Sequence, residues 1–224
     1  MRTNFLVAHA GATATVSASR RASSSGPCAA GSLQPHVAPG DFVVCDQLVD
    51  RTNGRADTFY DGPIVTHLSS ADIYDPTLRA LAIQTIRDHD IPVHERGTVV
   101  IIEGPRFSTK AESKWFSDAG WEVINMTQFP EAWLCRELGM AVVNIALITD
   151  YDAGVHEGTE AVDARSVLEV FQANAERIQK VVLDLIGRFP DDLDALGARD
   201  AMGPTRGDGH TITGEDIRLF ETGL

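Results

Sequence analysis

Two acidic side chains follow directly after the most apolar run of the chain. Asp150 and Asp152 come after Met140–Thr149, which has the length and composition of a buried strand. Alternation along an extended chain predicts that both side chains point the same way. If the pair is desolvated, one carboxyl group has a raised pKa and can donate a proton. The alternative interpretation is a pair of solvated loop acids in an acidic protein.

A flat apolar side chain and a hydroxyl stand at the end of another predicted strand. Thr98–Glu103 is followed by a Gly-Pro turn that leads to Phe107 and Ser108. Gly104 permits a close approach of the backbone, and ligands of open α/β sheets bind at such strand ends. The turn is therefore a candidate binding segment, with an ordinary loop before a helix as the alternative.

A third segment has the features of an anion site. Asn125, Met126 and Thr127 close a short strand just before a helix that begins at Pro130. Backbone N–H groups at a helix start, together with the Thr127 hydroxyl, can hold an anion. The alternative is that Thr127 only caps the helix.

The elements that must position these segments alternate between strand and helix patterns. This alternation predicts a single α/β domain. Short runs rich in Val and Ile predict strands at Phe42–Val49, Ile64–Leu68, Thr98–Glu103, Glu122–Asn125 and Met140–Thr149. Helical spacing predicts helices at Pro76–His89, Thr109–Ala119, Pro130–Leu138 and Asp163–Gly187. The last helix has an apolar stripe that must face a core or a neighbouring subunit.

Charge and cysteine content exclude several classes of partner and site. The 224-residue chain carries a formal net charge of −13, which repels nucleic acid and anionic membranes. Cys28, Cys45 and Cys135 lie far apart and form no disulfide or zinc pattern, so we expect free thiols in a cytoplasmic protein. No apolar run approaches the roughly 20 residues that a membrane-spanning helix needs.

Both ends of the chain differ in composition from its middle. No acidic residue precedes Asp41, and residues 1–25 are rich in Ala, Ser and Arg. We interpret residues 1–25 as a divergent leader without regular structure; a transit peptide and an incorrectly assigned start are the alternatives. Residues 26–190 form the predicted domain. Residues 191–224 form a loosely packed tail with a short helix near Gly214–Thr222.

Five collinear motifs give the chain a family resemblance. They read GPCAAGSL, DQLVDRT, EGPRFSTKAES, INMTQFPE and ITDYDAG. In this order and spacing they resemble the 5′-methylthioadenosine phosphorylases of the purine nucleoside phosphorylase family, over about Gly26 to Arg188. The resemblance implies one domain with a central mixed, partly closed β-sheet flanked by helices, assembled as a homotrimer. It also implies phosphorolysis of 5′-methylthioadenosine to adenine and 5-methylthioribose 1-phosphate, with inorganic phosphate as co-substrate and no metal or organic cofactor.

The resemblance gives each candidate residue a role. Asp150 and Asp152 resemble the catalytic acids that contact the base, and Phe107 and Ser108 resemble residues that line the base pocket. The ribose positions correspond to Asn125 and Met126, and the phosphate positions to Thr127, Cys28 and Ala29. The pocket for the 5′-substituent corresponds to Ala164, Val167 and, from a neighbouring subunit, His67.

The type of acid favours adenine nucleosides as substrates. A carboxylate accepts a hydrogen bond from the 6-amino group of adenine and repels a 6-carbonyl oxygen. Relatives that act on 6-oxopurines resemble a pattern with Asn and Glu where this chain has Asp150 and Ser108. A 6-oxopurine nucleoside phosphorylase is nevertheless an alternative.

The family's phosphate-binding N-terminal segment has no counterpart in this chain. Neither a Gly-rich GGSG-like loop nor an Arg-His pair occurs before Gly26. The sequence therefore resembles an N-terminally truncated member. A second alternative follows from this: a catalytically impaired remnant that binds purines or forms oligomers.

Overall fold

A mixed β-sheet forms the centre of the protein. The structure is a computed structural model that describes residues 5–10, 13–18, 23–60 and 67–189. The strands follow the order β5 (Gln47–Arg51), β7 (Thr98–Ile102), β8 (Val123–Asn125), β3 (Ser23–Ser32), β9 (Ala141–Asp150), β4 (Phe42–Val44) and β6 (Val93–His94). The pairs β5–β7, β7–β8, β3–β9 and β4–β6 are parallel, whereas β3–β8 and β4–β9 are antiparallel.

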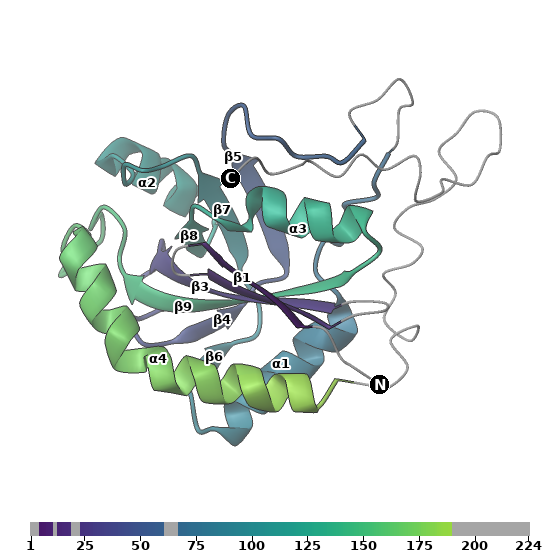
Figure 1. The fold of residues 1–224 in the computed structure, drawn as a ribbon. Coiled ribbons are helices and arrows are strands. Elements are labelled where there is room, and N and C mark those ends of the chain that lie inside the picture. The colour runs from purple at the N-terminus through teal and green to yellow at the C-terminus, as the bar shows by residue number, and fades with distance from the viewer. Residues whose placement is uncertain (1–4, 11–12, 19–22, 61–66, 190–224) are drawn as a thin grey trace.

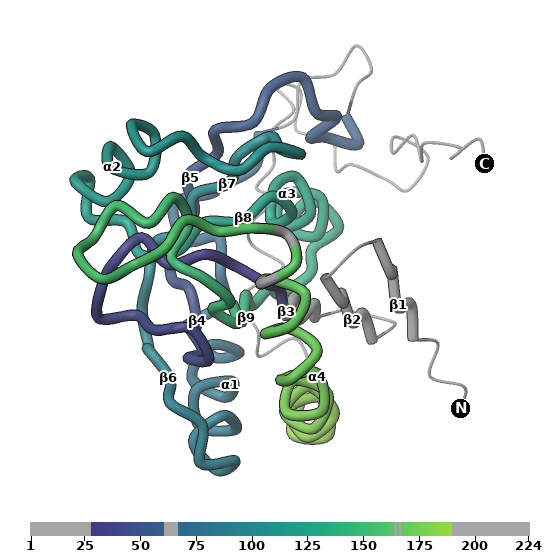
Figure 2. The backbone as a smooth tube through the Cα atoms, turned by 90° about the vertical axis from the view of Figure 1, so that its left-hand side faces the viewer, coloured from purple at the N-terminus to yellow at the C-terminus, as the bar shows by residue number. Residues whose placement is uncertain are grey.

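Helices cover both faces of this sheet. In the described part of the chain they are α1 (Pro76–Asp88), α2 (Lys110–Asp118), α3 (Gln128–Glu137) and α4 (Ala164–Gly187). The helices α1 and α4 lie side by side below the strands, and α3 lies above them (Figure 1; Figure 2). Asp75 and Thr109 cap α1 and α2 by accepting hydrogen bonds from the N–H groups of Leu78 and Glu112. The predicted α/β architecture is confirmed.

Strand β9 lies at the centre of the core because its side chains are buried on both faces. Ile145 and Leu147 pack in a cluster with α1 and α4, whereas Ala146 and Ile148 belong to a second cluster that includes residues of α3. This alternation is that of a strand covered on both sides. The rigid core therefore extends up to Asp150, the last residue of the strand.

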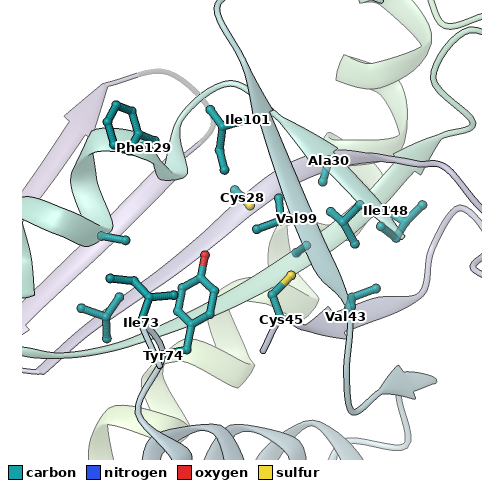
Figure 3. Close-up of a cluster of buried hydrophobic side chains, with 14 of the residues drawn as sticks. Cys28, Ala30, Val43, Cys45, Ile73, Tyr74, Val99, Ile101, Phe129 and Ile148 are labelled. Carbon is teal, nitrogen blue, oxygen red and sulfur yellow. The ribbon is translucent and has the colours of Figure 1, made fainter. Parts of the chain in front are cut away.

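The sheet curves until two distant strands approach each other. Three strands separate β4 from β7, which in a flat sheet would place them about 19 Å apart. Nevertheless the backbone N–H of Asp46, shortly after β4, donates to Gly97 O, just before β7, at 3.1 Å. Val43 and Val99 consequently share one buried cluster (Figure 3). The sheet is therefore mixed and partly closed, as the family resemblance implies.

One predicted strand is two strands in the structure. Phe42–Val49 breaks at Cys45 and Asp46, so that β4 pairs with β9 and β5 pairs with β7. The chain crosses from one part of the curved sheet to another, and the Asp46 carboxylate accepts a hydrogen bond from Gly97 N–H at 3.0 Å. Local hydrophobicity does not reveal this change of partner. The other predicted helices and strands agree within two residues, except Ile64–Leu68, most of which lies outside the described residues.

The N-terminal leader differs from the expectation of an unstructured segment. Within residues 1–25, β1 (Phe5–Ala10) and β2 (Thr13–Ala18) form an antiparallel hairpin, β3 begins at Ser23, and β2 pairs along β3. Alternating Val, Thr and Ala residues suit strands, and the edge of β3 offers backbone groups for pairing. Residues 191–224, with the predicted short helix, lie outside the described residues. Within the described part, no helix has the length and hydrophobicity needed to cross a membrane.

Candidate active site

A β-bulge at the end of β9 aims Asp150 at β3. The register between the two strands shifts, so that Ala30 pairs with Ile148 but Gly31 pairs with Asp150. Thr149 is the extra residue, and its Oγ1 lies 2.7 Å from Asp150 Oδ2 and 3.2 Å from Ala30 O. Bulges bend a strand and re-aim its side chains. The Asp150 carboxylate is therefore held in a fixed orientation at the strand end.

Gly31 leaves the space that this carboxylate occupies. A Cβ atom at this position would lie 2.8 Å from Asp150 Oδ1 and 2.9 Å from Ile124 Cγ2. Both distances are too short for atoms that are not bonded. The close approach of the strands at Asp150 thus depends on the missing side chain.

Asp152 reaches the same place through a turn. Its backbone N–H donates to Asp150 Oδ1 at 2.8 Å, and its φ angle of 46° lies in the left-handed region. The expectation that strand alternation orients both acids is therefore wrong, because the chain leaves the strand after Asp150. Both acids nevertheless line one pocket.

Burial raises the pKa of both carboxyl groups. For Asp150, burial is opposed by hydrogen bonds from the Thr149 hydroxyl and the Asp152 backbone. For Asp152, burial is again the largest cause, the charge of Asp150 raises the pKa further, and the hydroxyls of Ser113 and Ser108 lower it. Each group therefore holds a proton more readily than an ordinary aspartate. The pair is suited to donate a proton to a bound base.

The pocket in front of the two acids encloses about 300 Å³, including its open mouth. Phe107, Asn125 and Met126 line it together with Gly31, Ile102, Ile124, Asp150 and Asp152. Phe107 is 37% exposed, so part of its side chain is accessible to a ligand in the pocket. The three segments singled out in the sequence thus meet at one pocket.

Ser108 and Ser113 lie beside Asp152. In the described part of the chain, Ser108 Oγ, Ser113 Oγ and Asp152 Oδ2 are buried oxygens that find no hydrogen-bond partner. Hydrogen bonding from the two hydroxyls lowers the Asp152 pKa, so both lie next to its carboxyl group. Leaving such oxygens unpaired costs free energy. The two serine hydroxyls are therefore candidate donors to the Asp152 carboxylate.

Asn125 organises the start of α3. Its Oδ1 accepts hydrogen bonds from the backbone N–H groups of Thr127 at 3.3 Å and Gln128 at 3.5 Å, and its Nδ2 donates to Cys28 Sγ at 3.2 Å. The Thr127 side chain makes no capping hydrogen bond. Thr127 thus occupies the N-cap position of α3 without capping the helix through its side chain.

The Cys28 thiol lies in the core and not at the pocket. Its side chain is 2% exposed and sits among buried residues such as Tyr74 and Cys45 (Figure 3). Burial raises the Cys28 pKa to about 12, so the thiol stays neutral near pH 7. A phosphate contact at Cys28 would therefore have to come from its backbone. Ala29 is half-buried, and its side chain points to the other face of the strand.

The residues expected around a 5′-substituent are not brought together at this pocket. His67 is exposed, Val167 is half-buried near the start of α4, and the side chain of Ala164 lies outside the described residues. Neither His67 nor Val167 lines the pocket before Asp150. No group of three or more His, Cys, Asp or Glu residues within the described ranges is arranged to hold a metal ion.

Two residues of the site escape prediction from the sequence. Ser113 lies inside a helix, where its spacing from Ser108 does not show that both reach Asp152. Arg55 lies in a loop without a recognisable pattern, yet its guanidinium bonds the backbone at two edges of the pocket. The sequence gives no local signal for this role of Arg55, because the role depends on how the loop folds back toward the strand ends.

Fold and site together define a nucleoside-phosphorylase type of protein. The family model described as the phosphorylase superfamily matches residues 28–187, which include every residue that lines the pocket. The chain belongs to this superfamily.

Curated relatives are named after two related activities. S-methyl-5′-thioadenosine phosphorylase of Pyrococcus horikoshii is 48% identical over 164 residues, which cover 73% of this chain and 62% of that protein. The protein of the same name from Mycobacterium tuberculosis is 50% identical over 168 residues, covering 75% and 61%. Purine nucleoside phosphorylase of Streptomyces coelicolor is 44% identical over 183 residues, covering 78% and 64%. The chain thus spans less than two thirds of the length of these relatives.

Solved structures give the same family. Methylthioadenosine phosphorylase from Schistosoma mansoni, in complex with adenine, superposes with a TM-score of 0.75 at 32% identity and covers 82% of this chain and 72% of that chain. A mutant of adenosine/methylthioadenosine phosphorylase from the same organism holds methylthioadenosine; its TM-score is 0.74 at 32% identity, covering 82% and 71%.

Proposed function

We propose that the chain carries the adenine-nucleoside site of a 5′-methylthioadenosine phosphorylase. The observation that carries this proposal is the pair of buried aspartates, Asp150 and Asp152, with raised pKa values beside the exposed ring of Phe107. Adenine offers N7 as a proton acceptor and its 6-amino group as a donor, which complements a carboxyl pair. The adenine complex of the Schistosoma mansoni relative supports this choice of base.

The reaction uses the pocket as follows. The C1′–N9 bond breaks, its electron pair moves into the purine, and one of the two aspartic acids donates its proton to the base. A phosphate oxygen forms the new bond to C1′, which gives adenine and 5-methylthioribose 1-phosphate. Stabilising the charge that develops on the departing base lowers the barrier, because the stabilisation is strongest in the transition state.

The proposal also covers the phosphate site, the pocket for the 5′-group and the oligomeric state. We assign phosphate to the Thr127 hydroxyl and the backbone near Cys28 and Ala29, at the start of α3. The 5′-group would lie near Ala164 and Val167, with His67 supplied by a neighbouring subunit of a homotrimer. The reaction needs no metal or organic cofactor, and it suits a cytoplasmic enzyme of purine and methionine salvage.

A second candidate function is purine binding without turnover. The specific observation in its favour is that, within the described part of the chain, the lining of the pocket before Asp150 contains no Lys or Arg that would hold phosphate by charge. A 6-oxopurine phosphorylase is disfavoured by Asp150, which repels a 6-carbonyl oxygen.

One assay separates these functions. The 224-residue chain is incubated with 5′-methylthioadenosine or inosine, with and without phosphate, and free base is measured by chromatography. Phosphate-dependent adenine release supports the proposed function. Adenine binding without release supports the second candidate, and faster release of hypoxanthine from inosine contradicts the assignment of an adenine site.

A further inference from the structure

Every N–H donor of the Arg55 guanidinium is hydrogen-bonded to a backbone carbonyl or to the Glu103 carboxylate beside the pocket. Its Nη1 donates to Met126 O at 2.8 Å and to Phe129 O, and its Nη2 donates to Glu103 O at 2.9 Å and to Ile102 O at 3.4 Å. Its Nε donates to the Glu103 carboxylate at 3.3 Å. Arginine has five N–H donors, and this geometry gives a partner to each.

The four carbonyl acceptors belong to the two chain segments that carry the base and ribose residues. Ile102 ends β7, and Glu103 follows it and leads into the Gly-Pro turn before Phe107. Met126 lines the pocket, and Phe129 lies at a kink near the start of α3, where its backbone angles are not helical. The β7–β8 ladder stops at the pair of Ile101 and Asn125. Arg55 therefore joins the two segments where the ladder no longer does.

The two segments also pack closely against each other. A Cβ atom on Gly104 would lie 2.6 Å from Met126 Sδ, so the turn after β7 touches the ribose segment after β8. If the carbonyl ends separate, Phe107 and Met126 separate with them. A planar guanidinium with fixed donor directions resists this separation better than a point charge does.

A second arginine binds backbone carbonyls in a similar way, at residues that do not line the pocket. Arg79, in α1, donates from Nε to Cys45 O at 2.8 Å and from Nη2 to Glu95 O at 2.6 Å and Val44 O at 3.4 Å. Both arginines are half-buried, and Arg79 bonds none of the residues that line the pocket in front of Asp150. It therefore offers a matched control for the loss of a buried carbonyl-binding guanidinium.

We infer that Arg55 is a positioning residue that holds the Phe107 and Met126 segments at the spacing required to bind the base. The inference rests on the proposed adenine site and adds a residue to it. Arg55 is not part of the pocket lining and acts through the backbone carbonyls that it binds.

The test compares Arg55→Ala, Arg55→Lys and Arg79→Ala by calorimetry with adenine, together with thermal unfolding. Loss of hydrogen bonds from a charged donor should raise the adenine Kd of Arg55→Ala on the order of tenfold. Arg55→Lys supplies fewer donors and should fall between Arg55→Ala and wild type. Arg79→Ala should lower the melting temperature and leave the adenine Kd unchanged. A low concentration of guanidinium ion, far below that which unfolds proteins, should restore part of the affinity of Arg55→Ala and none of any loss in Arg79→Ala.

Hydrogen exchange supplies a readout that does not depend on the ligand. Amides of residues 103–107 and 126–129 should exchange faster in the Arg55 variants and not in Arg79→Ala. If Arg55→Ala does not fold, the adenine Kd and the hydrogen exchange of Arg55→Lys test the inference. An unchanged Kd and unchanged exchange in a folded Arg55 variant would overturn the inference while the adenine site stands. Failure of the wild-type chain to bind adenine would instead refute the proposed function, and the inference with it.

Discussion

Asp150 and Asp152 share a pocket but differ in what surrounds their carboxyl groups. Both oxygens of Asp150 accept hydrogen bonds, from the Asp152 backbone and the Thr149 hydroxyl, and this carboxylate is fixed by the bulge. Asp152 is 2% exposed, and its Oδ2 has no partner among the described residues. The carboxyl group of Asp150 is therefore held in place by well-formed hydrogen bonds, whereas that of Asp152 is held less firmly.

The orientation of Asp150 predicts that its charge matters most for the base. Asp150→Asn should lower the rate of adenine release by roughly a hundredfold, about 2–4 kcal/mol, because a carboxylate that accepts from the 6-amino group and supports N7 protonation acts in the transition state. Asp152→Ala should have a much smaller effect. The two variants are compared by phosphorolysis assay. If the 224-residue chain does not release adenine, the same substitutions are compared in a protein to which a phosphate-binding segment of the family has been added. Equal losses in the two variants would contradict the unequal roles.

Burial of Asp152 also predicts how stability depends on pH. Since its pKa is raised on folding, the folded state binds the proton more tightly, and its contribution to stability falls as pH rises from the unfolded pKa of about 4 through the folded pKa. Asp152→Asn should therefore raise the free energy of unfolding at pH 7, with a difference that vanishes below about pH 4. Asn also tolerates the left-handed backbone at this position.

A carboxylate whose pKa is shifted in the opposite direction serves as the control. Stability is measured by urea unfolding at pH 7 and below about pH 4. Asp88 has a lowered pKa because Arg188 and Gln84 donate to it, so Asp88→Asn should lower stability at neutral pH and lose this effect in acid. If Asp152→Asn destabilises the protein at pH 7, burial does not dominate at Asp152.

Strand ends, more than strand interiors, decide the geometry of the site. The glycine at the end of β3 allows β9 to bring Asp150 close, and a Cβ there would overlap Asp150 Oδ1. Gly31→Ala should lower stability by about 1–3 kcal/mol through overpacking and should abolish adenine binding, because Asp150 must shift. Gly97→Ala introduces a similar overlap, 2.8 Å from Val43 Cγ1, at a place that does not line the pocket.

These two glycine variants are compared by urea unfolding and adenine calorimetry. Gly97→Ala should lose stability but keep its affinity for adenine. Equal losses of affinity in both variants would show that adenine binding follows overall stability and not the position of Asp150.

Elements that depend on local pattern were predictable, and those that depend on partners were not. The apolar run before Asp150 and the capped helices α1 and α2 are visible in the sequence because burial and capping leave local signals. The break between β4 and β5 is not visible, since it arises when the chain changes partner strands in a curved sheet. The family motifs likewise identified Phe107, Met126 and Asp150 as site residues. The role of Arg55 was not predictable, because it depends on how the loop brings the guanidinium to the carbonyl of Met126.

At the scale of the molecule, the curved sheet concentrates acidic and neutral groups around the pocket. The chain carries a formal net charge of −13, and two of the acidic groups that contribute to it, Asp150 and Asp152, line the pocket itself. A neutral base that donates hydrogen bonds is attracted by such a site, whereas an anion is repelled. Arg55, which binds the carbonyl of Met126 in the ribose segment, already uses its donors on the chain itself.

This charge distribution predicts that the 224-residue chain binds adenine more tightly than phosphate. Contacts to the base, from Phe107, Asp150 and Asp152, all lie within the matched residues 28–187. The phosphate contacts that we assign are neutral donors, and charge-assisted hydrogen bonds are about twice as strong as neutral ones. Calorimetry should therefore give a phosphate Kd at least about tenfold higher than the adenine Kd, with phosphate affinity rising when salt screens the net negative charge. Saturable phosphate binding as tight as that of adenine would show that a cationic group outside the described residues completes the anion site.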